Sequence, residues 1–147
     1  MLFQQLINTA QCYPHQPALQ FAEHHWNWQQ FLNSVERISQ GLHEHGIQSG
    51  HHVGLWINNS PCFIFSLFAI LARGAIAVPL NPAMKSADYS YHRITLDAMI
   101  TTQNLFQQCL QVIAQPELHY FVCPNPDTCQ NWDLMASSDS EHFMQPN

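Results

Sequence analysis

Basic residues are scarce in this chain. It carries four lysines and arginines among 147 residues, against ten aspartates and glutamates, and its formal net charge is −6. A nucleic-acid-binding surface neutralises phosphates with several Lys or Arg side chains. The composition therefore predicts no nucleic-acid partner.

Glycine is missing from the second half of the chain. All five glycines lie at or before Gly74, and Lys85 is the only lysine. A loop that cradles phosphates needs closely spaced glycines, usually together with a lysine. Neither G-x-x-x-x-G-K nor G-x-G-x-x-G occurs in the sequence. The residues therefore predict no ATP phosphate loop, no catalytic residue and no cofactor bound by this segment.

A leader and a membrane span are also lacking. Residues 1–5 read MLFQQ, without the basic start and apolar core of a signal peptide. The most apolar stretch, residues 62–80, is interrupted by Arg73, Gly74 and Pro79 and falls short of the ~20 residues that span a bilayer. We expect a cytoplasmic protein without a transmembrane segment.

Cysteines and histidines show no metal-binding spacing. The cysteines stand at positions 12, 62, 109, 123 and 129. They form no C-x2-C pair, and their odd number indicates reduced thiols. Cys62 and Cys109 lie in apolar helical patterns, so we expect them in the core. Four histidines between residues 43 and 52 leave a weak surface metal site open, but polar surface is the simpler interpretation. We predict no metal site.

Residues 53–82 have the pattern of a strand, a helix and a second strand. Val53–Ile57 and Ala75–Leu80 are apolar runs. Between them Ser60 is a good helix N-cap, the proline after it suits the first helical position, and Gly74 suits the end of the helix. Such a segment predicts a parallel βαβ unit with a right-handed crossover, in a sheet that is covered on both faces.

The remaining elements alternate in the same way. Helices are expected at residues 2–12, from Asn27 to Gly46, from about 86 to 96 and from Asn104 to about 114, and strands at 18–21, 25–27, 98–102 and 118–123. The predicted fold is α/β, a layered α/β/α domain with a mostly parallel sheet of about four strands, preceded by an N-terminal β-hairpin. The strand order cannot be read from the pattern. We assign residues 1–123 to this domain and residues 124–147 to a polar, acidic tail.

The segment NNSPCFIFSLFAILARGAIAVPLNP carries a resemblance to a known family. It resembles the stretch N-S-x-(apolar helix)-A-G-A-x-x-V-P-L-N-P near the start of the adenylate-forming (AMP-binding) superfamily. The preceding turn, hairpin and first long helix are similar to that superfamily's opening as well. Arg73 replaces the usual Ala before the glycine, and His51 replaces the usual Asp before the strand. The resemblance covers roughly residues 1–125, which corresponds to the first quarter or so of a family enzyme.

Members of this superfamily activate a carboxylate with ATP to an acyl-adenylate, and many pass the acyl group to coenzyme A. The resemblance implies a truncated N-terminal piece of an AMP-forming acyl-CoA synthetase or ligase, with a setting in fatty acid metabolism. The phosphate loop and the catalytic C-terminal domain are absent, so we expect no catalysis by this chain alone. ATP, magnesium and coenzyme A are implied for a complete enzyme.

The resemblance also suggests a contact and partners. In relatives that use coenzyme A, the backbone after the second parallel strand can lie near the coenzyme's adenine, and the matching residues here are Leu80, Asn81 and Pro82. A turn that merely ends a strand is the simpler interpretation of these residues. The expected partner is the missing remainder of the enzyme or a second copy in a homodimer. The alternative function is a non-catalytic binding or interaction module that retains this fold.

Overall fold

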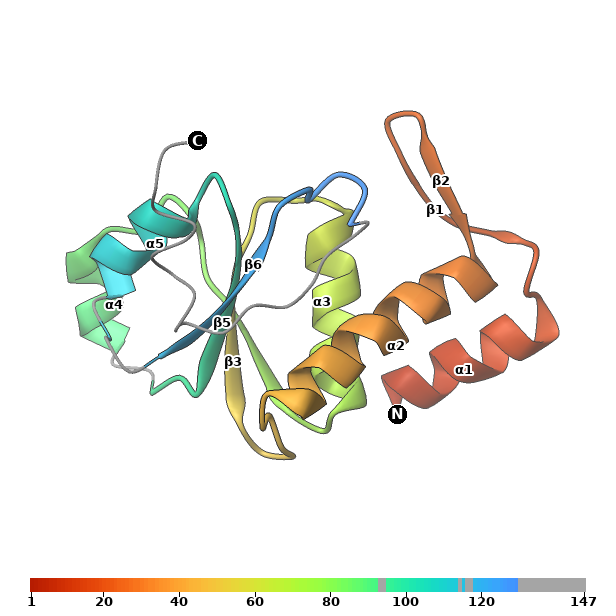
Figure 1. Ribbon diagram of the computed structural model, residues 1–147, viewed down its shortest axis with the longest axis horizontal. Helices are drawn as coiled ribbons and strands as arrows, with labels where there is room; N and C mark the ends of the chain where they lie inside the picture. Colours follow the sequence, from red (N-terminus) through yellow and green to blue (C-terminus); the bar gives the residue numbers. More distant parts are fainter. Residues whose placement is uncertain (93–94, 114, 116–117, 130–147) are drawn as a thin grey trace.

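The computed structural model describes residues 1–92, 95–113, 115 and 118–129. Its elements are, in chain order, α1 (Leu2–Cys12), β1 (Pro17–Phe21), β2 (His24–Asn27), α2 (Trp28–Glu44), β3 (His52–Trp56), α3 (Pro61–Ala72), β4 (Ile76–Pro79), α4 (Ser86–His92), β5 (Ala98–Thr102), α5 (Phe106–Ile113) and β6 (His119–Cys123). The strands β1 and β2 form the antiparallel hairpin, which stands beyond α2, away from the main sheet (Figure 1).

The main sheet has four parallel strands in the order β4-β3-β5-β6. The crossover through α3 leads from β3 to the edge strand β4, and the crossover through α4 leads back past β3 to β5. Helices α1, α2 and α3 lie on one side of the sheet, and α4 and α5 lie on the other (Figure 1). The structure confirms the predicted layers and hairpin, and it supplies the strand order that the sequence pattern left open.

The helix ends follow the local signals. The Asn27 side chain accepts a hydrogen bond from the Gln30 backbone N–H at 2.8 Å, and the Gln30 side chain accepts one from the Asn27 N–H at 2.9 Å. The Ser60 hydroxyl caps α3 by accepting a hydrogen bond from the Phe63 N–H at 3.4 Å. Beyond the ends of α2 and α3, Gly46 and Gly74 have φ angles of +86° and +71°. The left-handed region costs glycine little, so both helices end where the sequence predicts.

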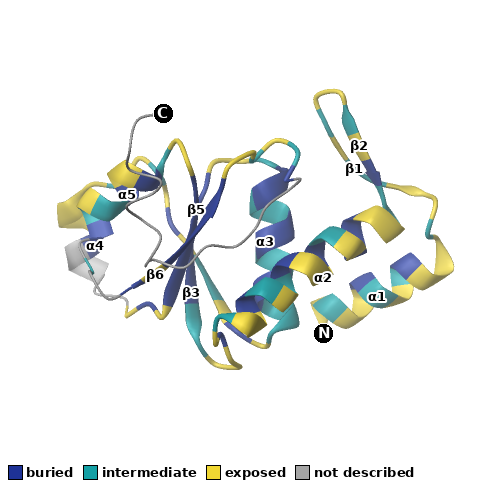
Figure 2. Cartoon of the chain, viewed as in Figure 1, coloured by how far each residue is buried: buried dark blue, intermediate teal, exposed yellow. Residues whose placement is uncertain are grey.

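Two apolar clusters fill the space on either side of the sheet. The first cluster lies beneath α2, α3 and the hairpin. In it the ring centroid of Phe65 lies 5.4 Å from that of Trp26 and 5.0 Å from that of Phe31, and both contacts are edge-on. The second cluster lies beneath α4 and α5 and contains Phe106 and Tyr120, whose ring centroids are 5.5 Å apart. Because both faces are covered, the strands β5 and β6 are buried almost throughout (Figure 2).

Some local details differ from the prediction. The hairpin turns at Ala22 with a φ angle of +53°, although no glycine is present. Helix α4 ends at His92 rather than near residue 96, and α5 begins at Phe106. Asn104 lies in the turn before α5, where its side chain accepts a hydrogen bond from the Thr102 hydroxyl at 2.6 Å. In the described part of the chain, every helix is too short or too polar to cross a lipid bilayer.

Candidate functional site

The carboxyl edge of the parallel sheet is where this topology places a ligand site. In doubly wound sheets, ligands bind in the crevice outside the strand ends at the point where the strand order reverses, which is here between β3 and β5. A cavity of about 140 Å³ lies at this point. It is lined by Ile57, Asn58, Asn59, Ser60, Thr102, Asn104, Pro126 and Asp127.

Two hydroxyl groups of this crevice donate hydrogen bonds to other residues of its lining. The Ser60 hydroxyl donates to the Asn58 carbonyl oxygen at 3.0 Å, and the Thr102 hydroxyl donates to the Asn104 side chain. The lining includes no basic side chain and a single carboxylate, that of Asp127. Small-molecule sites usually have volumes of about 300–1,000 Å³. ATP and a magnesium ion therefore do not fit the crevice that these residues form, and no catalytic step follows from it.

The sequence reasoning missed this crevice, although a signal was present. Polar residues follow two apolar strands directly, as Asn58-Asn59-Ser60 after β3 and as Thr101-Thr102 at the end of β5. The carboxyl ends of neighbouring parallel strands meet at one edge of a sheet. The two signals could not be joined before β3 and β5 were known to be neighbours.

The turn at Leu80–Pro82 follows the edge strand β4. The Asn81 side chain accepts a hydrogen bond from the Ala83 N–H at 2.9 Å, and the Pro82 carbonyl oxygen accepts one from the Gln108 side chain at 3.0 Å. Leu80 is buried, whereas Asn81 is exposed. These contacts are typical of a turn that ends a strand, and the bond from Gln108 holds the turn against α5. The contact of this turn with coenzyme A stays a prediction.

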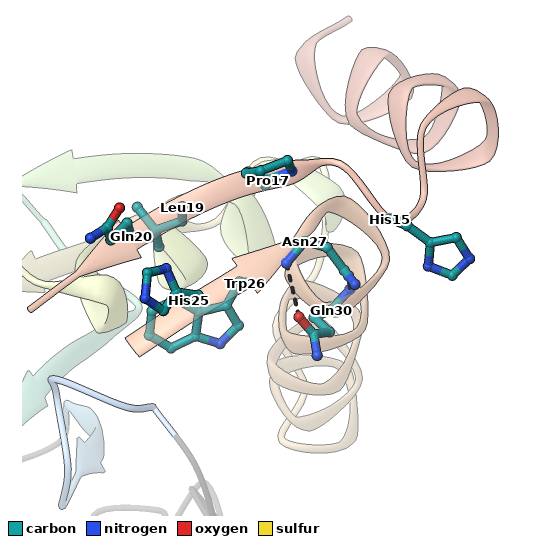
Figure 3. A pocket seen from close by; sticks show the side chains of 9 residues that line it. His15, Pro17, Leu19, Gln20, His25, Trp26, Asn27 and Gln30 are labelled. Carbon is teal, nitrogen blue, oxygen red and sulfur yellow. Dashed lines mark hydrogen bonds between the residues drawn. The ribbon is translucent and has the colours of Figure 1, made fainter. Parts of the chain in front are cut away.

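A larger hollow of about 450 Å³ lies along the hairpin. Figure 3 shows the side chains of its lining, in which Asn27 and Gln30 bond to each other and His15 points away from the other labelled residues. The Trp26 side chain is 8% exposed and packs on Phe65 in the first cluster. Asn27, Gln30 and Trp26 thus serve the hairpin and the start of α2, and the groove offers no pair of groups for acid–base chemistry.

The histidines of residues 43–52 make separate contacts. The Arg73 guanidinium donates to His43 Nδ1 at 2.9 Å, and His45 Nδ1 lies 2.9 Å from the Gly41 carbonyl oxygen. Among the described residues, the group that gathers three metal-binding side chains consists of Cys62, Cys123 and Cys129 instead. Both cysteines that the sequence placed in the core, Cys62 and Cys109, are fully buried.

The described part of the predicted tail returns to the body of the protein. The Pro126 carbonyl oxygen accepts a hydrogen bond from the Cys62 N–H at 3.0 Å, and the Cys129 carbonyl oxygen accepts one from Arg37 at 2.8 Å. Residues 124–129 are thereby held on α3 and α2. Residues 130–147 lie outside the described residues, and the boundary at residue 123 stays a prediction.

Comparison with known proteins gives a consistent set of matches. The sequence profile of a family described as AMP-binding enzyme matches residues 6–118. The mitochondrial medium-chain acyl-CoA ligase of Rattus norvegicus is 31% identical over 85 residues, which cover 56% of this chain and 14% of that protein. The 4-coumarate–CoA ligase 2 of Petroselinum crispum is 28% identical over 109 residues, which cover 71% of this chain and 20% of that protein.

Solved structures match the fold more completely. A benzoate CoA ligase from Burkholderia xenovorans superposes with a TM-score of 0.76 at 16% identity, over 88% of this chain and 27% of that one. An anthranilate CoA ligase in complex with anthranoyl-AMP gives a TM-score of 0.76 at 23% identity, over 88% and 26%. The chain thus spans about a quarter of these structures, and 14% and 20% of the two curated relatives.

Proposed function

Because the chain belongs to the AMP-binding enzyme family, we propose that it forms the N-terminal subdomain segment of an AMP-forming acyl-CoA ligase. In a complete enzyme it scaffolds the site that activates a carboxylate with ATP. It does not adenylate alone.

The extent of the fold match carries this proposal. Nearly nine-tenths of the chain, 88%, superposes on 27% of a benzoate CoA ligase. The chain has no glycine-rich loop with a lysine. The fold match together with the lack of such a loop supports a scaffold that has no phosphate-binding part of its own. The groups that hold ATP and magnesium come from the remainder of the enzyme.

The edge strand β4 supports a macromolecular partner. Among the described residues it pairs with β3 alone, and Ile76 within it is 46% exposed. An apolar edge strand invites pairing with further chain. The remainder of the ligase is the partner we propose, and a homodimer would cover the same edge. The proposal includes a cytoplasmic location and a role in fatty acid metabolism.

The turn at Leu80–Pro82 is proposed as the coenzyme contact. Asn81 is exposed there, and its side-chain oxygen is fixed by the Ala83 N–H. An exposed side chain at this position can meet the adenine of coenzyme A in the assembled enzyme.

The test is ATP–pyrophosphate exchange with a medium-chain fatty acid or an aryl acid. We expect no exchange by the purified chain, and exchange when the chain is mixed with a relative's ligase from which the matching segment has been removed. A Gly74→Val variant, which we expect to be destabilised, serves as the control that should restore less exchange. Exchange by the chain alone that survives further purification contradicts the proposal. So does a mixture that neither associates nor exchanges, and the non-catalytic module is then favoured.

A further inference from the structure

Three cysteines that are distant in sequence meet at the carboxyl edge of β6. Cys62 is the second residue of α3, Cys123 is the last residue of β6, and Cys129 follows in the next turn. Their sulfur atoms all lie within 4.8 Å of one another. The side chains are 0%, 0% and 1% exposed. The turn after β6 reaches the upper end of α3, where this thiol cluster lies (Figure 1).

The backbone around the thiol cluster is held firmly. The Cys62 N–H donates to the Pro126 carbonyl oxygen at 3.0 Å, and the Cys129 N–H donates to the Asn125 carbonyl oxygen at 2.7 Å. Cys129 has a φ angle of +54°, a conformation that is strained for a residue with a side chain and persists where the surroundings require it. Arg37 of α2 fastens the carbonyl of Cys129 from across the first cluster.

Two positive groups lie near the thiol cluster. The positive end of the α3 dipole lies at Cys62, and the Arg37 guanidinium lies beside Cys129. Hydrogen bonds from the Cys129 and Cys62 thiols lower the pKa of Cys123, whereas hydrogen bonding to Cys123 and burial raise the pKa of Cys62 and of Cys129, so a bound cation has to displace protons from those two thiols. The contrast is Cys109 in the second cluster, where burial alone raises the pKa of the thiol to about 12.

The spacing of the sulfurs is compatible with a shared metal ion. Thiolates bound about 2.3 Å from a tetrahedral zinc ion stand about 3.8 Å apart, which is within the observed limit. A disulfide joins two sulfurs and would leave the third without a role. We propose that Cys62, Cys123 and Cys129 form a binding site for a thiophilic divalent cation, with zinc as the ion that it takes.

Charge supports a divalent ion. Three thiolates around Zn²⁺ carry one net negative charge, which the Arg37 guanidinium balances; a monovalent ion would leave a second negative charge buried. In the described part of the chain, no further His, Cys, Asp or Glu joins the group. The fourth position therefore falls to a water molecule or to the buried Ser66 hydroxyl, which lies 3.9 Å from the Cys62 sulfur. Binding fastens the turn at residues 124–129 to α3 and releases the thiol protons.

The first experiment titrates the reduced, metal-free chain with Cd²⁺ and follows the thiolate-to-metal charge-transfer absorption. We expect one ion per chain. Cys62→Ser, Cys123→Ser and Cys129→Ser should each weaken binding by more than about 100-fold, beyond the loss seen when only supporting residues change. Cys109→Ser is the matched buried control, and Cys12→Ser is the exposed one; both should bind like the parent. The proposal is contradicted if the three site variants show the same charge-transfer absorption as the parent, or if Cys109→Ser loses that absorption.

The second experiment keeps the test valid if a buried Cys→Ser variant fails to fold. X-ray absorption of the zinc-loaded parent should show three sulfur ligands at about 2.3 Å. Zinc should also raise the temperature midpoint of unfolding, and the gain in stability should grow with the logarithm of its free concentration above the dissociation constant. Coordination by nitrogen and oxygen alone, no binding of zinc, or a disulfide between two of the three cysteines in the freshly isolated protein would overturn the proposal.

Discussion

The two faces of the sheet are covered in different ways. Helices α2 and α3, with 17 and 12 residues, cover the first face, whereas α4 and α5, with seven and eight, cover the second. Short helices gain little stability of their own, so the second face depends more on tertiary contacts. It also holds two buried polar atoms, Trp56 Nε1 and the Tyr120 hydroxyl, that lack a hydrogen-bond partner within the described residues.

This difference indicates where the stability of the domain resides. In the first cluster the capped helix α2, the hairpin and α3 meet around Phe65. In the second cluster each unpaired polar atom costs about 1–3 kcal/mol of desolvation. We therefore expect the first cluster to tolerate a cavity least, and the second to gain from the removal of a polar group.

The largest effect should come from truncating an aromatic ring in each cluster. Phe65→Ala should cost about 4–5 kcal/mol of unfolding free energy, because the ring is fully buried and its edge-on contacts with Trp26 and Phe31 are lost with the cavity that forms. Phe106→Ala, at 1% exposure in the second cluster, should cost about 3 kcal/mol. Urea unfolding measures both. If Phe106→Ala is the more costly of the two, the ranking of the faces is reversed.

The next effect concerns the corner at Gly74, which ends α3 and leads into β4. Gly74→Val should cost about 3 kcal/mol, because a β-branched residue is strained at positive φ and its Cβ would lie 2.9 Å from the Ser49 hydroxyl. Gly50→Ala is the matched control. It shares a positive φ, but no atom lies within 4 Å of the added Cβ, so it should cost about 1 kcal/mol. Equal urea midpoints for the two variants would show that the Ser49 contact adds nothing.

The smallest effect should be a gain. Tyr120→Phe removes the unpaired hydroxyl and should stabilise the protein by about 1 kcal/mol at neutral pH. Burial, with Cys109 and Tyr89 nearby, raises the pKa of Tyr120. The unfolded chain therefore loses this proton first, and the parent loses stability as the pH rises above about 10. Tyr120→Phe should flatten that alkaline decline, whereas Tyr13→Phe, 57% exposed, should not. If Tyr120→Phe has the same urea midpoints as the parent across this pH range, the role of Tyr120 is contradicted.

Local signals predicted most of the fold. The capping box at Asn27, the N-cap Ser60 and the left-handed Gly46 and Gly74 act over a few residues, so the pattern alone locates them. The turn between the hairpin strands was predicted, but the left-handed conformation of Ala22 was not, because a left-handed residue other than glycine leaves no mark in the sequence. Asn104 misled it because the side chain of an Asn can bond within a turn as readily as it caps a helix.

The candidate sites were less predictable, because they depend on contacts between distant residues. Cys62 and Cys123 come together only because β6 lies beside β5 in the sheet, on the side of β3 away from β4. A spacing rule for metal sites compares residues that are close along the chain and cannot find a set that runs from Cys62 to Cys129. The crevice at Asn58 and Thr102 was hidden for the same reason.

The central place of β3 in the sheet has a consequence for synthesis on the ribosome. β3 is complete at Trp56, but its neighbour on one side begins at Ile76 and its neighbour on the other begins at Ala98. The nascent chain therefore carries an apolar strand that stays unpaired until its neighbours β4 and β5 have been translated. Parallel sheets of this kind fold slowly and pass through intermediates that are prone to aggregate. We expect a pause in translation before Ala98 to favour aggregation, and one after Cys123 to be harmless.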